Sequence, residues 1–203
     1  MANANAPFGL MPEEHLSGTM NTVMGHRYYV KSDNSSAFYI GSPVKLTNTG
    51  DANGVPGVDV AAGTDTLVGT VIGIEQPNVN TTSMVGTTLA LEQVSIPATK
   101  SRDYYVYVAD DPHQIFVMQC GAVTTNLVST KLNNNASMTI TAPSPSTLPN
   151  SAAVIDNASI ATNNTLNLAL MGLWQGPNTS LGAYQIMRCK INLHQYANGR
   201  TGV

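Results

Sequence analysis

Short runs of alternating apolar and polar residues occur along most of this chain. In residues 103–108, Tyr105 and Tyr107 fall on one face and two valines on the other, and this period of two is typical of a half-buried strand. Residues 185–193 alternate in the same way. The pattern also predicts strands at 20–31, 37–40, 44–47, 58–60, 67–74, 87–91, 115–119 and 165–171.

Clusters of turn residues separate these runs. The segment 48–57 reads NTGDANGVPG, and 33–36 reads DNSS, which predicts a hairpin-like pairing of 20–31 with 37–40. One short helix is predicted at 124–132, with Thr124 or Thr125 as its cap. Many short strands divided by turns are typical of a β-sandwich, a jelly roll or a barrel. We therefore expect an all-β chain with one sandwich-like or jelly-roll-like core.

The two ends of the chain differ from its middle. Residues 1–16 hold small residues, two prolines and a Phe-Gly-Leu-Met cluster without helical or strand periodicity. We expect an extended N-terminal arm at 1–16, a β core at 17–193 and a C-terminal tail at 194–203.

Composition supports the all-β expectation and narrows the class of partner. Only 10% of the residues are charged, whereas Asn, Thr and Ser together supply 57 of 203 residues, and these favour strands and turns over helices. The net charge is -3, with 9 Lys and Arg, too few for the basic patch that nucleic acid or an anionic membrane requires. The longest apolar run, 168–174, is too short for a membrane span, and residues 1–12 do not resemble a secretory signal.

Catalytic and metal-binding motifs are absent from the sequence. The four histidines, His15, His26, His113 and His194, show no HxH, HxxxH or HExxH spacing, and neither GxSxG nor a nucleotide-binding glycine motif occurs. We therefore expect no enzyme, no cofactor and no metal.

Other reactive side chains have ordinary explanations. Cys120 and Cys189 are expected as free thiols in the core. The acidic pairs 13–14 and 110–111 are expected on the solvated surface, and Trp174 is expected to pack in the core.

These observations favour a role in surface contact rather than in turnover. The segment from Pro7 to Pro12 cannot bury its apolar side chains by itself, so it either stays disordered or docks on a neighbouring molecule, and we expect docking. The predicted contact residues come from both ends of the chain: Pro7, Phe8, Leu10, Met11, Pro12, His194, Gln195 and Tyr196.

An ordered set of segments along the chain gives a more specific indication. The set comprises MANANAPFGLMP at 1–12, YIGSPVKL at 39–46, GDANGVP at 50–56, RDYYVYVADDP at 102–112, GLWQGPN at 172–178 and KINLHQ at 190–195. In this order the set resembles the head decoration, or cement, proteins of tailed bacteriophages, particularly short-tailed ones. The resemblance spans most of the chain.

The resemblance implies a virion protein made in the cytoplasm of the host bacterium. Such a protein binds the outer face of the capsid, bridges subunits of the major capsid protein and stiffens the DNA-filled head. It is similar to small β-sandwich or jelly-roll proteins that associate with themselves as dimers or trimers. Repeated modest contacts make release from the shell require several breaks at once.

Two other functions fit the sequence. Asn-rich loops and exposed tyrosines are also typical of a carbohydrate-binding or receptor-binding β-sandwich. A minor head–tail component is a further alternative within the phage class.

Overall fold

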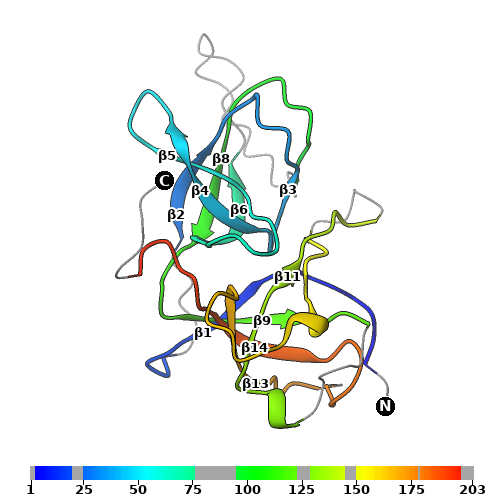
Figure 1. Ribbon diagram of the computed structural model, residues 1–203. Coiled ribbons are helices and arrows are strands. Elements are labelled where there is room, and N and C mark those ends of the chain that lie inside the picture. Colours follow the sequence, from blue (N-terminus) through cyan, green and yellow to red (C-terminus); the bar gives the residue numbers. More distant parts are fainter. Residues whose placement is uncertain are drawn as a thin grey trace.

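Strands dominate the computed structural model, which describes residues 3–19, 25–75, 95–122, 129–144, 150–177 and 179–197. Figure 1 shows a barrel above an open sheet. The helical elements of the described residues are two 3-10 turns, Ser129–Lys131 and Asn157–Ser159. No helix in the described ranges has the length and apolar character needed to cross a membrane.

Five strands close into the barrel, in the order β2-β5-β4-β6-β8. Their bounds are β2 His26–Val30, β4 Pro43–Gly50, β5 Pro56–Val60, β6 Gly69–Glu75 and β8 Tyr104–Ala109. The pairs are antiparallel except β2 with β5, which is parallel through Tyr29 and Gly57. Valines fill much of the interior, and β3 (Phe38–Tyr39) with β7 (Ser95–Ile96) adds Phe38 and Ile96 to the same cluster.

The second half of the fold is an open antiparallel sheet in the order β1-β9-β14-β13-β10. Its strands are β1 Met11–His15, β9 Gln114–Gln119, β14 Ile186–Ile191, β13 Leu168–Leu173 and β10 Asn135–Ala136. A short pair, β11 (Met138–Thr139) with β12 (Val154–Ile155), completes this half. The apolar cluster on the sheet also takes in Ala61, Leu67 and Ala109 from the barrel side. The two hydrophobic cores therefore meet at the junction of barrel and sheet.

The expected all-β class is confirmed, and so is the alternation that predicted individual strands. In β8, Val106 and Val108 are buried whereas Tyr107 is exposed. In β14, Met187, Cys189 and Ile191 are buried in alternation. Within the all-β class, the strands form a closed barrel beside an open sheet.

Two local predictions have a different outcome. The hairpin-like pairing of 20–31 with 37–40 is wrong, because β2 pairs with β5 and β8 whereas β3 pairs with β7. A tight turn indicates that the chain reverses but does not fix the strand partners. The predicted strand at 87–91 and most of the predicted helix at 124–132 lie outside the described residues.

The N-terminal segment is part of the fold rather than a free arm, which corrects the expected boundary at residue 16. The side chain of Asn3 donates to the backbone oxygens of Ser180 and Ala183. The Gln119 amide accepts from the Ala6 N–H at 3.2 Å and donates to the Ala4 oxygen at 2.8 Å. These contacts hold the segment along the sheet, where it leads into β1 (Figure 1).

The tail predicted from residue 194 also begins within the fold. His194 is 1% exposed and forms a bridge with Leu67. Gln195 donates its N–H to the Leu67 oxygen at 2.7 Å, and its side-chain oxygen accepts the N–H of Leu46 at 2.7 Å. The first residues after β14 therefore join the sheet to the barrel.

Candidate functional site

The predicted contact residues divide into buried and accessible side chains. Leu10 is 0% exposed and His194 is 1% exposed, so neither side chain reaches the surface of this chain. Pro7, Phe8, Met11, Pro12 and Gln195 are partly exposed, and Tyr196 is 48% exposed. The accessible members of the set therefore exclude Leu10 and His194.

The acidic pair 13–14 is not the freely solvated surface that was expected. Glu13 accepts from Arg188 Nε at 3.1 Å and from the Trp174 indole N–H at 2.5 Å. Glu14 forms a second ion pair with Arg188. All four side chains are partly buried, so Trp174 is not a fully buried core residue either. Strand pairing brings these residues together from far apart in the chain.

A second acidic pair stands at the turn where β8 of the barrel leads into β9 of the sheet. The turn comprises residues 110–113. Asp110 and Asp111 are adjacent, but they engage different histidines, His26 and His15 respectively. The third histidine, His113, lies in the turn itself, and both aspartate charges act on the fourth, His194. The fold thus gathers all four histidines around one turn.

Asp110 anchors a buried network, which corrects its prediction as solvated surface. Its carboxylate is 2.6 Å from the Tyr28 hydroxyl, which donates to it, and 2.8 Å from His26 Nδ1. The Tyr28 and Tyr196 hydroxyls are 2.9 Å apart. Burial, followed by the hydrogen bond to Asp110, raises the pKa of Tyr28 far above its usual range. The phenol is therefore a hydrogen-bond donor and not a base at neutral pH.

His194 is held as a neutral ring beneath this network. Its Nδ1 accepts the Tyr196 N–H at 3.0 Å, which leaves the ring proton on Nε2. Burial lowers the pKa of His194 from 6.5 to about 4, because the charged ring would lose its hydration, and nearby Asp110 offsets only part of this effect.

Because the folded pKa of His194 lies below the unfolded value, the unfolded chain binds more protons between pH 6.5 and about 4. The stability contribution is complete above pH 6.5 and is lost as the pH falls through this window. We expect a loss of about 2 kcal/mol in the free energy of unfolding between pH 7.5 and pH 5 from this residue. Urea unfolding at the two pH values measures the loss.

The variant His194→Gln removes the titrating ring and should show a pH dependence smaller by that amount. His113→Gln serves as the control, since its side chain is 62% exposed. A pH dependence that is unchanged in His194→Gln would contradict this assignment.

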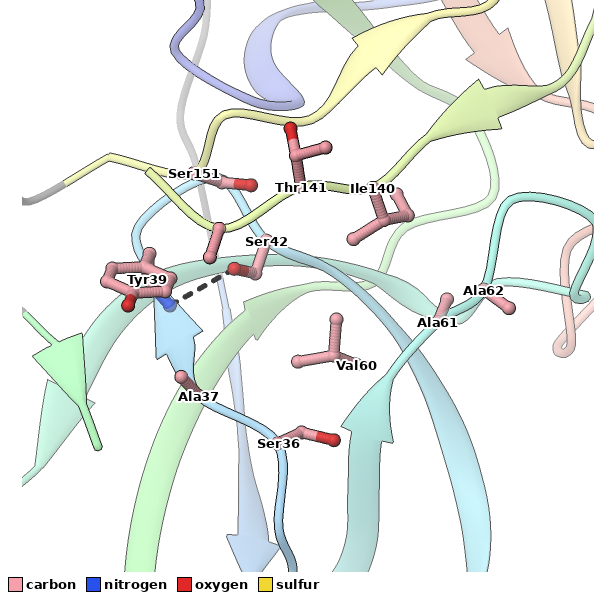
Figure 2. A pocket seen from close by; sticks show the side chains of 11 residues that line it. Ser36, Ala37, Tyr39, Ser42, Val60, Ala61, Ala62, Ile140, Thr141 and Ser151 are labelled. Carbon is pink, nitrogen blue, oxygen red and sulfur yellow. Dashed lines mark hydrogen bonds between the residues drawn. The ribbon is translucent and has the colours of Figure 1, made fainter. Parts of the chain in front are cut away.

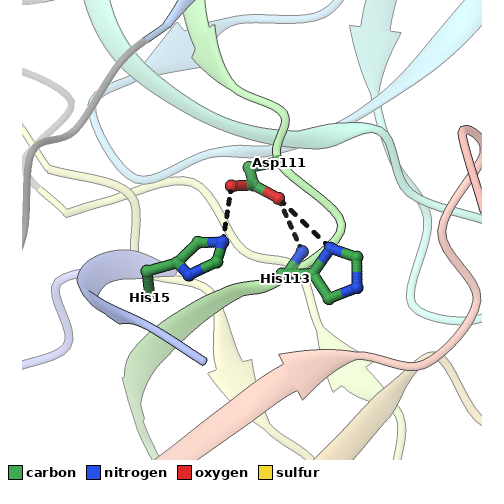
Figure 3. Close-up of side chains that lie close together, drawn as sticks. All are labelled: His15, Asp111 and His113. Atoms are coloured by element: carbon green, nitrogen blue, oxygen red, sulfur yellow. Dashed lines mark hydrogen bonds and ion pairs between the residues drawn. The ribbon is translucent and has the colours of Figure 1, made fainter. Parts of the chain in front are cut away.

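Asp111 lies between His15 and His113 (Figure 3). Its Oδ2 is 3.1 Å from His15 Nε2, and its Oδ1 is 3.7 Å from His113 Nδ1. The three residues are partly or fully exposed, and their potential metal-ligand atoms lie within 4.8 Å of one another. Among the described residues, this is the one cluster of three or more His, Cys, Asp or Glu side chains that could hold a metal ion. The sequence search missed it because His15 is almost one hundred positions away from the Asp-Pro-His run.

A neutral cavity of about 300 Å³ lies beside the barrel (Figure 2). Val60 of β5, Tyr39 of β3 and Ser42, just before β4, line it on one side, and Thr141 and Ser151 line it from the segment between β11 and β12. The Ser42 hydroxyl accepts the Tyr39 N–H at 3.1 Å, and the Thr141 hydroxyl donates to the Ala152 oxygen at 2.9 Å. Among the described residues that line this cavity, none is charged, and they offer neutral polar and apolar contacts.

The two cysteines are free and buried, as expected. Burial raises the pKa of the Cys120 thiol to about 12, and it raises the pKa of the Cys189 thiol further. Both thiols therefore remain protonated at neutral pH and are poor nucleophiles.

Comparisons with known proteins give no relative: no family model, no curated protein and no solved structure matches this chain.

Proposed function

We propose that this chain is a decoration protein of a tailed bacteriophage that binds the outer face of the capsid and cements neighbouring subunits of the major capsid protein. The observation that carries the proposal is the ordered set of segments that resembles this family. The all-β fold, with a low density of charge, is compatible with it.

The segments that carry the resemblance also contact one another in the fold. Leu10, from the first segment, donates its N–H to the oxygen of Gly41, from the second, at 2.9 Å. The segment 102–112 supplies Asp110 and Asp111, and 190–195 supplies His194. These residues of the resembling segments lie at the junction of barrel and sheet.

Capsid contact needs apolar side chains that remain accessible, because interface cores are poor in charge and rich in aromatic residues and Met. The large apolar side chains exposed among the described residues are Leu16, Tyr107, Met171, Leu181 and Tyr196. Tyr196 is the most exposed of them, at 48%, and it belongs to the predicted contact set. Tyr196 and the partly exposed Phe8 and Met11 are therefore our candidate capsid-contact residues.

The test is the copy number of this chain relative to the major capsid protein in gradient-purified virions, measured by quantitative mass spectrometry. Decoration requires many copies per shell, with a ratio near one for full occupancy. A few copies per particle would indicate a head–tail component instead. Absence from the particle would overturn the proposal, and glycan-array binding would then favour the carbohydrate-binding alternative.

The contact assignment has its own test. Tyr196→Ala should weaken binding to undecorated shells by at least about fivefold, because truncating an important aromatic interface residue costs more than about 1 kcal/mol of binding free energy. Tyr107→Ala is the matched control, since that tyrosine is 40% exposed on the barrel. Co-sedimentation with shells measures both variants, and equal binding by Tyr196→Ala and the unmodified chain would contradict the assignment.

A further inference from the structure

The cluster of His15, Asp111 and His113 has the donor set and the spacing of a metal site. We propose that these three side chains bind a divalent transition-metal ion, with Zn²⁺ as the ion of choice. Two imidazoles and one carboxylate are ligands that Zn²⁺ accepts, and three protein ligands leave the fourth position for water. This site is independent of the capsid function proposed above.

The potential ligand atoms lie somewhat farther apart than a tetrahedral ion would hold them. Zn²⁺ ligands at about 2.0–2.1 Å in tetrahedral geometry stand about 3.3 Å from one another. His15 Nε2 lies 3.1 Å from Asp111 Oδ2, and His113 Nδ1 lies 3.7 Å from the other oxygen, Oδ1. One potential ligand atom from each of the three residues lies within 4.8 Å of the others, so the side chains must draw together to surround an ion. Figure 3 shows both rings beside the carboxylate.

Neighbouring groups already orient two of the three ligands. The Asp111 carboxylate accepts the backbone N–H of His113 at 2.7 Å. The Ser17 hydroxyl lies 2.8 Å from His15 Nδ1, so it can accept the Nδ1 proton when Nε2 binds the ion. A hydrogen bond to the second ring nitrogen is the usual support of a metal-bound histidine. In this structure Nδ1 also accepts the Ser17 N–H at 3.1 Å. That contact is lost when Nε2 binds the ion, because Nδ1 then carries the ring proton.

The backbone also fixes the two ligand-bearing segments together. His15 pairs with Gln114 in the β1–β9 ladder. Leu16 donates its N–H to the His113 oxygen at 2.9 Å, and the Gln114 side chain donates to the Glu14 oxygen at 2.8 Å. The ligand positions are therefore set before the metal arrives, and an ion can enter directly because the His113 side chain is 62% exposed.

A bound ion would tie the N-terminal strand to the turn that connects barrel and sheet. Because it binds the folded chain and finds no such geometry in the unfolded one, it stabilises the fold by linkage. At a Zn²⁺ concentration 100 times the dissociation constant, we expect Tm to rise by about 5–10 °C.

The experiment is a calorimetric titration of the full chain, without a histidine tag, with ZnCl₂. We expect saturable binding of one ion per chain. His113→Gln should weaken binding by more than about tenfold, and Ser17→Ala by about tenfold through the loss of ring support. His26→Gln is the matched control, because it also removes one histidine beside an aspartate but lies outside the cluster, and it should bind like the unmodified chain.

Co²⁺ gives an independent readout, since its visible spectrum reports the coordination geometry. A tetrahedral spectrum that is lost in His113→Gln and retained in His26→Gln supports the site. The proposal is overturned if no saturable Zn²⁺ binding occurs, if His113→Gln binds as tightly as the unmodified chain, or if His26→Gln loses as much affinity as His113→Gln.

Discussion

Replacing Leu10 with alanine lowers the free energy of unfolding by about 3 kcal/mol, within the range of 2–5 kcal/mol for buried leucines. Leu10 is 0% exposed and belongs to the apolar cluster of the open sheet, together with Phe116 and Met118 of β9. The substitution removes apolar contacts and leaves a cavity that the surrounding strands fill only in part. Urea unfolding followed by circular dichroism measures the change.

Leu16→Ala is the matched control for this result. Leu16 lies six positions later, just after β1, and is 46% exposed, so its replacement should change stability by no more than about 0.5 kcal/mol. Equal effects of the two substitutions would mean that Leu10 is not a core residue and that the N-terminal segment is an arm after all.

This result changes how the capsid contact is tested. If the segment 1–16 were a free arm, deletion of residues 1–12 would leave the rest folded and would only weaken capsid binding. Deletion instead removes Leu10 from the core and part of β1 from the sheet. Loss of binding by the truncated chain would therefore not distinguish lost contacts from lost folding. Substitution at Tyr196, which is 48% exposed, leaves Leu10 and β1 in place; it removes the hydroxyl contact with Tyr28, so urea unfolding of the variant accompanies the binding measurement.

Replacing Gly9 with alanine is expected to cost about 3 kcal/mol, for two reasons that add. Gly9 has φ +77°, a left-handed conformation that costs a residue with a Cβ about 1–2 kcal/mol. A Cβ at this position would also lie 2.3 Å from the Gly41 oxygen and 2.8 Å from Ser151 Cβ. The backbone would have to move apart, with a cost in the range of 1–3 kcal/mol for overpacking.

Gly54→Ala separates the two contributions. Gly54 has a similar φ of +85°, but no atom lies within 4 Å of its added Cβ. We expect a loss of only about 1 kcal/mol there. Thermal unfolding of both variants gives the comparison, and a loss at Gly9 no larger than at Gly54 would rule out the close backbone approach between Gly9 and Gly41.

The N-terminal residues show why the arm was predicted and why that prediction is wrong. The segment has no periodicity of its own, and Phe8, Leu10 and Met11 find no apolar partner nearby in sequence. In the fold this segment meets β9, about one hundred residues later: Met11 lies opposite Val117 and Pro12 opposite Phe116, and Leu10 joins the apolar cluster that contains Phe116. A local pattern can report that a side chain needs burial, but not where in the folded chain the partner lies.

The histidines illustrate the same limit for the candidate site. Metal motifs are found in sequence when their ligands lie on one turn or one helix, and here only Asp111 and His113 are close neighbours. His15 joins them because β1 pairs with β9 in a register that places His15 opposite Gln114. The sequence therefore shows only two of the three candidate metal ligands, Asp111 and His113, close together.

Local chemistry alone determined the all-β class, the faces of β8 and β14 and the buried free thiols, because alternation and side-chain polarity act on each strand separately. The tertiary structure decided which strands pair, how the barrel closes, that the N-terminal segment is built into the sheet and that four distant histidines surround one acidic turn. These features depend on contacts between residues far apart in the chain. The free energy that stabilises these features comes from burying two surfaces against each other. The sequence of one surface alone does not show which distant segment it will pack against.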